Sequence, residues 1–74
     1  MVVLISTNNC MGCNKTKHHL KSKGVPFFEY SSTDDTIMNM FGHFIKSFPT
    51  VVVFSEGAIT HWCGFSEEKL NEIP

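Results

Sequence analysis

The pattern of apolar and polar positions predicts a strand–helix–strand unit in the first half of the chain. The apolar run Val2–Ser6 is typical of a strand buried on both faces. A stretch rich in helix formers predicts a helix over about Met11–Lys23, and Gly24 is placed to end it in a left-handed cap. Phe27–Ser31 follows a proline break and predicts a second strand. Because such crossovers are right-handed and connect parallel strands, we expect these two strands to be parallel.

The next segment carries the strongest periodic pattern in the chain. Thr33-Asp34-Asp35 supplies a capping side chain and acids for the first turn of a second helix, and the apolar residues after it recur at helical spacing. These residues, which we expect to pack in the core, are Ile37, Met40, Phe41, Phe44, Ile45 and Phe48. The pattern therefore predicts one helical face that extends to Phe48.

Two strands and a short helix complete the predicted fold. Val51–Phe54 is rich in β-branched residues, and Ala58–Trp62 follows after a tight turn, so the short link predicts an antiparallel hairpin. Ser66 is a capping residue for a last helix. The predicted order is strand, helix, strand, helix, strand, strand, helix. We therefore expect a single α/β domain over residues 1–74, with three helices and a mixed four-stranded sheet.

Composition and charge limit what this domain can do. The 74 residues include seven Phe, four Met, one Trp and one Tyr, which is enough for one small core. The net charge of −1 gives no bulk attraction to nucleic acid or to a membrane, so we expect neither as a partner. The N-terminal apolar run is short and has no basic residue before it, so we expect no signal peptide and no membrane span. Three cysteines cannot all pair within one molecule, and we expect a reducing cytoplasm.

Candidate chemistry concentrates in the tetrapeptide Cys10-Met11-Gly12-Cys13, between the first predicted strand and the first predicted helix. A Cys-x-x-Cys pair at such a junction favours a redox pair, because one cysteine sits at the helix cap and the other in the first turn. The cap cysteine lies among unpaired backbone N–H groups at the positive end of the helix dipole. This environment favours the nucleophilic thiolate.

Two features of the first helix leave alternatives open. Its outer face is basic and carries Lys15, Lys17, His18, His19, Lys21 and Lys23. These cations either complement the helix dipole or add a docking surface for an acidic partner and support for a thiolate at Cys10. Cys10, Cys13 and Cys63 with His18 or His19 could also supply zinc ligands, although the spacing is not that of a standard zinc finger. A metal-binding module is therefore a rival to the redox interpretation.

The order of elements and three motifs resemble the thioredoxin fold in its short glutaredoxin form, and most closely the NrdH-redoxins. The motifs are Cys10-Met11-Gly12-Cys13, Phe48-Pro49-Thr50-Val51-Val52 and Trp62-Cys63-Gly64-Phe65, and the resemblance covers essentially the whole chain. It implies a cis peptide bond before Pro49 and a loop there that faces the cysteines. It also implies a substrate-binding surface made of Met11, Gly12, Phe48, Pro49, Thr50, Trp62, Cys63, Gly64 and Phe65.

The resemblance implies thiol–disulfide exchange by a monomer, with the redox-active Cys10–Cys13 disulfide, no other bound cofactor and no metal. Cys10 attacks a partner disulfide and Cys13 resolves the mixed disulfide. NrdH-redoxins take electrons from thioredoxin reductase and pass them to class Ib ribonucleotide reductase, whereas glutaredoxins take electrons from glutathione. The usual glutathione clamp has a Gly-Gly turn followed by an acid. The single glycine and bulky ring at Gly64 and Phe65 favour the NrdH side over a glutathione-dependent glutaredoxin.

Three positions depart from the family pattern. Thr7 stands where Lys or Arg is common, which removes a cation near the first cysteine. Ile5 replaces a frequent Tyr, and Cys63 replaces the usual Ser of the last turn. Cys63 is either a small near-isosteric substitution or a third redox-active thiol or metal ligand. The letters from Cys63 to Ser66 match the active site of iron–sulfur-carrying monothiol glutaredoxins, but they lie after the last strand, so this match carries little weight.

Overall fold

The computed structural model describes residues 1–74, and the order of its elements is the predicted one. The strands are β1 (Val2–Ser6), β2 (Phe28–Ser31), β3 (Thr50–Ser55) and β4 (Ala58–Cys63), and the helices are α1 (Met11–Ser22), α2 (Asp35–Phe41) and α3 (Glu67–Asn71). No helix is long and apolar enough to cross a membrane.

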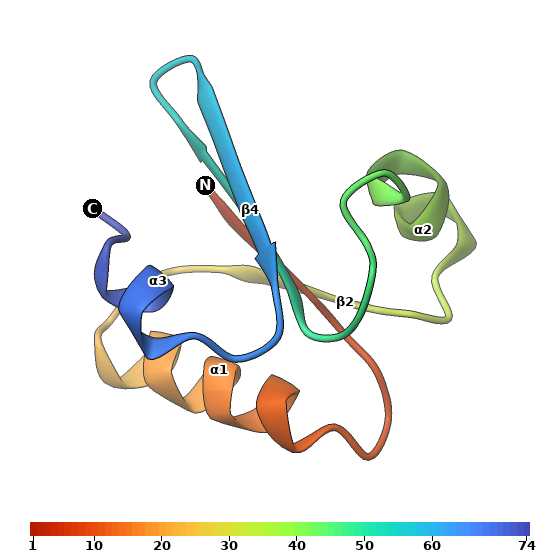
Figure 1. Ribbon diagram of the computed structural model, residues 1–74, viewed down its shortest axis with the longest axis horizontal. Helices are drawn as coiled ribbons and strands as arrows, with labels where there is room; N and C mark the ends of the chain where they lie inside the picture. Colours follow the sequence, from red (N-terminus) through yellow and green to blue (C-terminus); the bar gives the residue numbers. More distant parts are fainter.

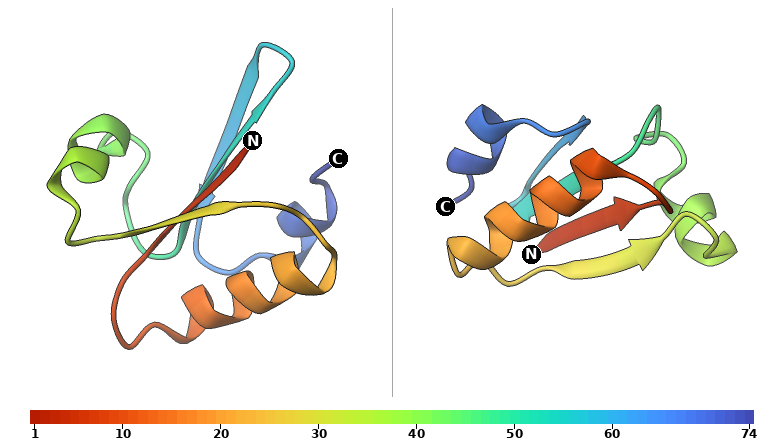
Figure 2. Two further views of the ribbon diagram at one scale, coloured as in Figure 1. Left: turned by 180° about the vertical axis from the view of Figure 1, so that it is seen from behind. Right: turned by 90° about the horizontal axis from the view of Figure 1, so that it is seen from below.

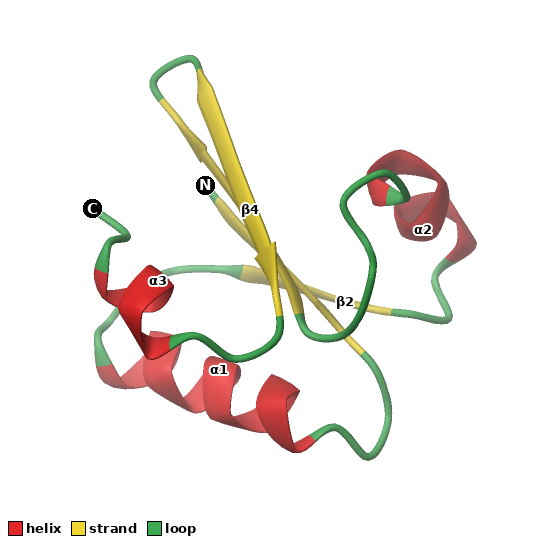
Figure 3. Cartoon of the chain, in the orientation of Figure 1, coloured by secondary structure: helices red, strands yellow, loops and turns green.

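The four strands form one mixed sheet in the order β2-β1-β3-β4. Strand β1 runs parallel to β2, as predicted, and antiparallel to β3 (Figure 2, right). Strands β3 and β4 form the predicted antiparallel hairpin, whose turn residues Glu56 and Gly57 both have positive φ (Figure 3). Strand β1 is therefore central, and its carboxyl end delivers the chain to α1.

The sheet separates two apolar layers. Helices α1 and α3 lie next to each other on one face and α2 lies on the other (Figure 1). The α1/α3 layer contains Val2, Leu4, Leu20, Val51, Val53 and Leu70, and the α2 layer contains Val3, Ile5, Ile37, Phe41 and Val52. Successive residues of β1 alternate between the two layers, because strand side chains point to opposite faces. This explains why the whole run is apolar.

The second helix is shorter than the periodic pattern predicted. It ends at Phe41, and backbone bonds from Phe44 to Phe41 and from Ile45 to Gly42 form tighter turns after it. Phe44 and Ile45 still pack on the core, so the apolar spacing correctly indicated that they are buried but not that they are helical. The prediction that Met40 packs in the core was wrong, because Met40 is 62% exposed.

Candidate active site

Cys10 and Cys13 form a disulfide at the N-terminus of α1, with their Cα atoms 5.2 Å apart. Asn9 has a positive φ of 53° and turns the chain so that Cys10 can take the extended N-cap conformation. The Cys10 Sγ accepts a hydrogen bond from the backbone N–H of Cys13 at 3.1 Å. Cys10 is half-buried, whereas Cys13 is only 2% exposed. Cys10 is therefore the sulfur that a partner can reach.

Two distant segments meet the first turn of α1, in the arrangement that the resemblance implied. A methyl group placed on Gly12 would lie 3.3 Å from Cδ of Pro49 and 3.7 Å from Cβ of Phe65. The Phe48–Pro49 peptide bond is cis, as the resemblance implied. The backbone N–H of Gly64 donates to the carbonyl of Pro49 at 2.8 Å and so ties these two segments together. Because Gly12 has no side chain, the loop can pack directly on the helix next to the disulfide.

Exposed apolar side chains flank the disulfide. Met11 is 73% exposed and Phe65 is 40% exposed. The Lys15 ammonium lies 5.9 Å from the centre of the Phe65 ring, and the His19 ring meets the same ring edge-on. Part of the basic face of α1 is thus continuous with the apolar surface beside Cys10.

Thr50 and Cys63 lie behind the Pro49 loop. Thr50 is fully buried and donates a hydrogen bond to the carbonyl of Ser47 at 2.8 Å, and its hydroxyl lies 3.5 Å from Cys63 Sγ. The free thiol of Cys63 donates to the carbonyl of Phe44 at 3.3 Å. Burial raises the pKa of Cys63, but hydrogen bonding with the Thr50 side chain and with residues 46 and 47 outweighs it, so the net pKa is lowered. These contacts fasten β4 to the segment that leads into Pro49.

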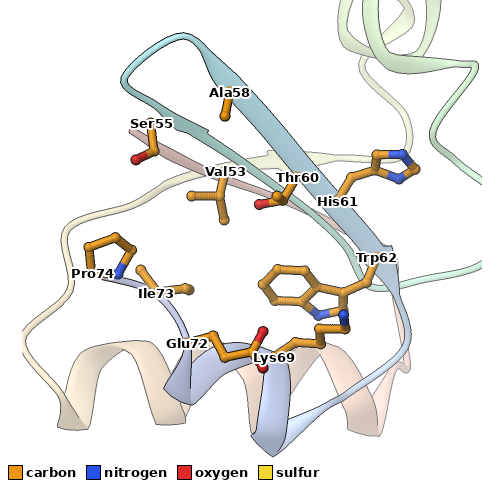
Figure 4. A pocket seen from close by; sticks show the side chains of 10 residues that line it. All are labelled: Val53, Ser55, Ala58, Thr60, His61, Trp62, Lys69, Glu72, Ile73 and Pro74. Carbon is orange, nitrogen blue, oxygen red and sulfur yellow. The ribbon is translucent and has the colours of Figure 1, made fainter.

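The side chains of Phe48 and Trp62 lie apart from the disulfide. Phe48 packs on the α2 layer. Trp62 packs on the α1/α3 layer and lines a cavity of about 270 Å³, where Figure 4 shows its ring beside Lys69 and Glu72. The Trp62 Nε1–H is buried there without a hydrogen-bond partner. The side chains of these two predicted contact residues therefore pack on the apolar layers of the sheet.

A polar cavity of about 310 Å³ lies directly beside the disulfide. It is lined by Ser6, Thr7, Asn8, Asn9, Cys10, Cys13, Asn14, Lys17, Glu29 and Ser31. Lys17 and Glu29 form an ion pair there at 2.9 Å, and Ser6 Oγ donates to Glu29 at 3.0 Å. Burial raises the pKa of Glu29, but the bonds from Lys17 and Ser6 outweigh it and lower the pKa overall.

Sequence reasoning did not single out Glu29. It lies in the predicted second strand, and no local pattern connects it to the cysteines. The spacing of Cys13 and Lys17 shows only that these two residues share a helix face, and it does not point to Glu29.

The structure does not assemble a ligand cluster from the residues considered for zinc. No three side chains of His, Cys, Asp or Glu lie close enough together to hold a metal ion. The Cys63 thiol is directed to the Phe44 carbonyl and the Thr50 hydroxyl.

No protein-family model and no curated protein matches the sequence. Solved structures do match it. The glutaredoxin-like protein NrdH-redoxin from Escherichia coli superposes with a TM-score of 0.79 at 17% identity, over 99% of this chain and 93% of that one. The thioredoxin-like protein BC3987 gives 0.79 at 27% identity, over 97% of both chains. A glutaredoxin from Archaeoglobus fulgidus gives 0.72 at 24% identity, over 96% of this chain and 82% of that one.

These similarities extend over nearly the whole chain. The chain therefore has the thioredoxin fold in its short, glutaredoxin-like form, as the motifs predicted.

Proposed function

We propose that this chain is a dithiol–disulfide oxidoreductase, an electron carrier that reduces disulfides of other proteins. The observation that carries the proposal is the Cys10–Cys13 disulfide at the start of α1, with the half-buried sulfur beside the Pro49 loop. The N–H of Cys13 is placed to donate to a thiolate at Cys10 once the disulfide is reduced. The positive end of the dipole of the 12-residue helix α1 also favours the Cys10 thiolate over the thiol.

The reaction begins with the reduced dithiol. The Cys10 thiolate attacks one sulfur of the partner disulfide, a Cys10–partner bond forms, and the second partner sulfur leaves as a thiolate and takes up a proton. Cys13 then loses its proton and attacks the Cys10 sulfur. The Cys10–Cys13 bond forms, and the first partner sulfur leaves and is protonated. The partner gains two electrons and two protons, and a reductase returns the chain to the dithiol.

The surface around Cys10 suits a polypeptide partner. Met11 and Phe65 offer exposed apolar contacts, and Gly12 and Gly64 are partly accessible. We assign direct contact with the partner to these four residues. We assign a supporting role to Pro49 and Thr50, which are fully buried, to Phe48 and Trp62, which pack on the two apolar layers, and to Cys63, which contacts Thr50.

For the electron donor we favour thioredoxin reductase, and for the acceptor class Ib ribonucleotide reductase, in the reducing cytoplasm. A glutathione-dependent glutaredoxin is the alternative, because a glutaredoxin shares the fold. A glutathione clamp needs an acid after the glycine turn. Here that turn has one glycine and continues into the bulky Phe65 and into Ser66, whose Oγ accepts the N–H of Lys69 as the cap of α3, so the first acids come only within α3. This arrangement favours the NrdH-type donor.

A coupled assay tests the proposal. Reduction of a protein disulfide such as that of insulin is followed by NADPH consumption, once with thioredoxin reductase and once with glutathione and glutathione reductase. We expect turnover with the first donor system and little with the second. The reverse preference would establish the glutaredoxin alternative. No turnover with either system, in a chain whose dithiol titrates normally, would refute the proposed function.

A further inference from the structure

No Lys, Arg or His lies in the segment before Cys10. Thr7 lies three residues before Cys10, and its hydroxyl accepts a hydrogen bond from Ser32. Thr7 nevertheless lines the polar cavity beside the disulfide, and a cation enters that cavity from another element. This cation is Lys17 of α1.

Lys17 is held in place from two directions. It lies four residues after Cys13, and in an α-helix the later side chain of such a pair leans back toward the N-terminus over the earlier one. Its ammonium is fixed at 2.9 Å by Glu29, which is itself fixed by Ser6. The pair thus lines the same cavity as Cys13, and only about one-third of each charged side chain is exposed.

Resting on the proposed function, we propose that Lys17, tethered by Glu29, is a positioning residue that favours the thiolate of Cys13 in the resolving step. Cys13 must lose its proton while buried, and burial disfavours a charged sulfur. A cation in the adjoining cavity offsets that cost. The charge thereby speeds the attack of Cys13 on the mixed disulfide and the release of the partner.

Few other charges act on this cavity. Its titratable lining groups are Cys10, Cys13, Lys17 and Glu29, and Lys21 acts on Glu29 from the next turn of α1. Pro49 and Phe65, which meet Gly12, are uncharged, and the Lys15 ammonium lies 5.9 Å from the centre of the Phe65 ring. The remaining thiol, at Cys63, is directed to the Phe44 carbonyl. Lys17 is therefore the charge whose removal should change the resolving step most.

Stopped-flow reaction of the reduced chain with Ellman's reagent separates the two steps. The first release of coloured thiolate reports attack by Cys10 and depends on reagent concentration. The second release reports resolution by Cys13 and does not. The variants are Lys17→Gln, Lys17→Arg, Glu29→Gln and, as a matched loss of one positive charge at the far end of the same helix, Lys23→Gln.

We expect Lys17→Gln to slow the second phase about three- to tenfold near neutral pH, since a partly exposed cation has a moderate effect. Its pH midpoint should rise, Lys17→Arg should restore the rate, and Lys23→Gln should leave both phases as they are. Glu29→Gln should also slow the second phase, because Lys17 loses its tether.

The opposite results are equally specific. A second phase that Lys17→Gln does not change, or that Lys23→Gln slows as much, would overturn the role of Lys17. If Glu29→Gln made the second phase faster, the proposed role of Glu29 in holding Lys17 would be wrong, because the carboxylate would then act only as a negative charge that opposes the Cys13 thiolate. Absence of the first phase in the wild-type chain would instead count against the proposed function.

Discussion

Replacing Gly12 with alanine should separate activity from stability in this domain. Gly12 lies in the first turn of α1, where the chain needs no unusual backbone angle. The added methyl would lie 3.3 Å from Cδ of Pro49, closer than such carbons normally approach. Pro49 cannot yield freely, because its ring is buried and its carbonyl is bonded to the N–H of Gly64. The loop should therefore shift by a few tenths of an ångström.

The two contributions to stability nearly cancel. Alanine gains about 0.5–1 kcal/mol over glycine in a helix, and mild overpacking costs about 1 kcal/mol. We therefore expect the free energy of unfolding to change by less than about 1 kcal/mol, as measured by urea titration. A displacement of 1 Å at a reacting centre costs about a hundredfold in rate, so a few tenths should lower kcat/KM about three- to tenfold.

Gly24→Ala is the matched control. Gly24 has a φ of +68° with open space around it, so a methyl there strains the backbone by about 1–2 kcal/mol and touches nothing. This variant should be less stable than Gly12→Ala yet retain wild-type kcat/KM under folding conditions. Unchanged kcat/KM in Gly12→Ala, or an equal loss in Gly24→Ala, would refute the idea that the contact between helix and loop at Gly12 shapes the partner site.

Three further results are expected. Cys13→Ser should accumulate a mixed disulfide with a partner, visible on a non-reducing gel, whereas Cys10→Ser should lose reductase activity; activity in Cys10→Ser would reverse the assigned roles. Leu4→Ala removes a fully buried side chain of the central strand and should cost about 2–5 kcal/mol in urea unfolding; a cost under about 1 kcal/mol would contradict the packing. Because the folded pKa of Glu29 is lowered, its ion pair stabilises the fold above its ordinary pKa of 4.5, and this is lost as pH falls through the lower folded value. Glu29→Gln should thus be less stable than wild type at neutral pH by about 0.5 kcal/mol, the small value reflecting partial exposure, and the two curves should converge in acid. A difference that persists in acid would exclude the ion pair as its source.

Local patterns in the sequence determined most of the architecture. The apolar run of β1, the caps at Asp34 and Ser66 and the positive φ at Gly24 all depend on neighbouring residues, and all are found as predicted. The Cys-x-x-Cys spacing likewise predicted a pair at a helix start, and the Cys10–Cys13 disulfide confirms it. Such features can be predicted because a few consecutive residues fix them.

Only the tertiary structure decided what depends on residues far apart in the chain. The apolar spacing beyond Phe41 suited both a longer helix and a turn whose side chains return to the sheet, and the chain turns. The resemblance grouped Trp62 with the partner site, but its ring packs toward α3. The ion pair of Lys17 and Glu29 joins a helix to an edge strand and leaves no trace in local sequence. Periodicity reports which side chains are buried, whereas only the packed sheet fixes what each of them meets.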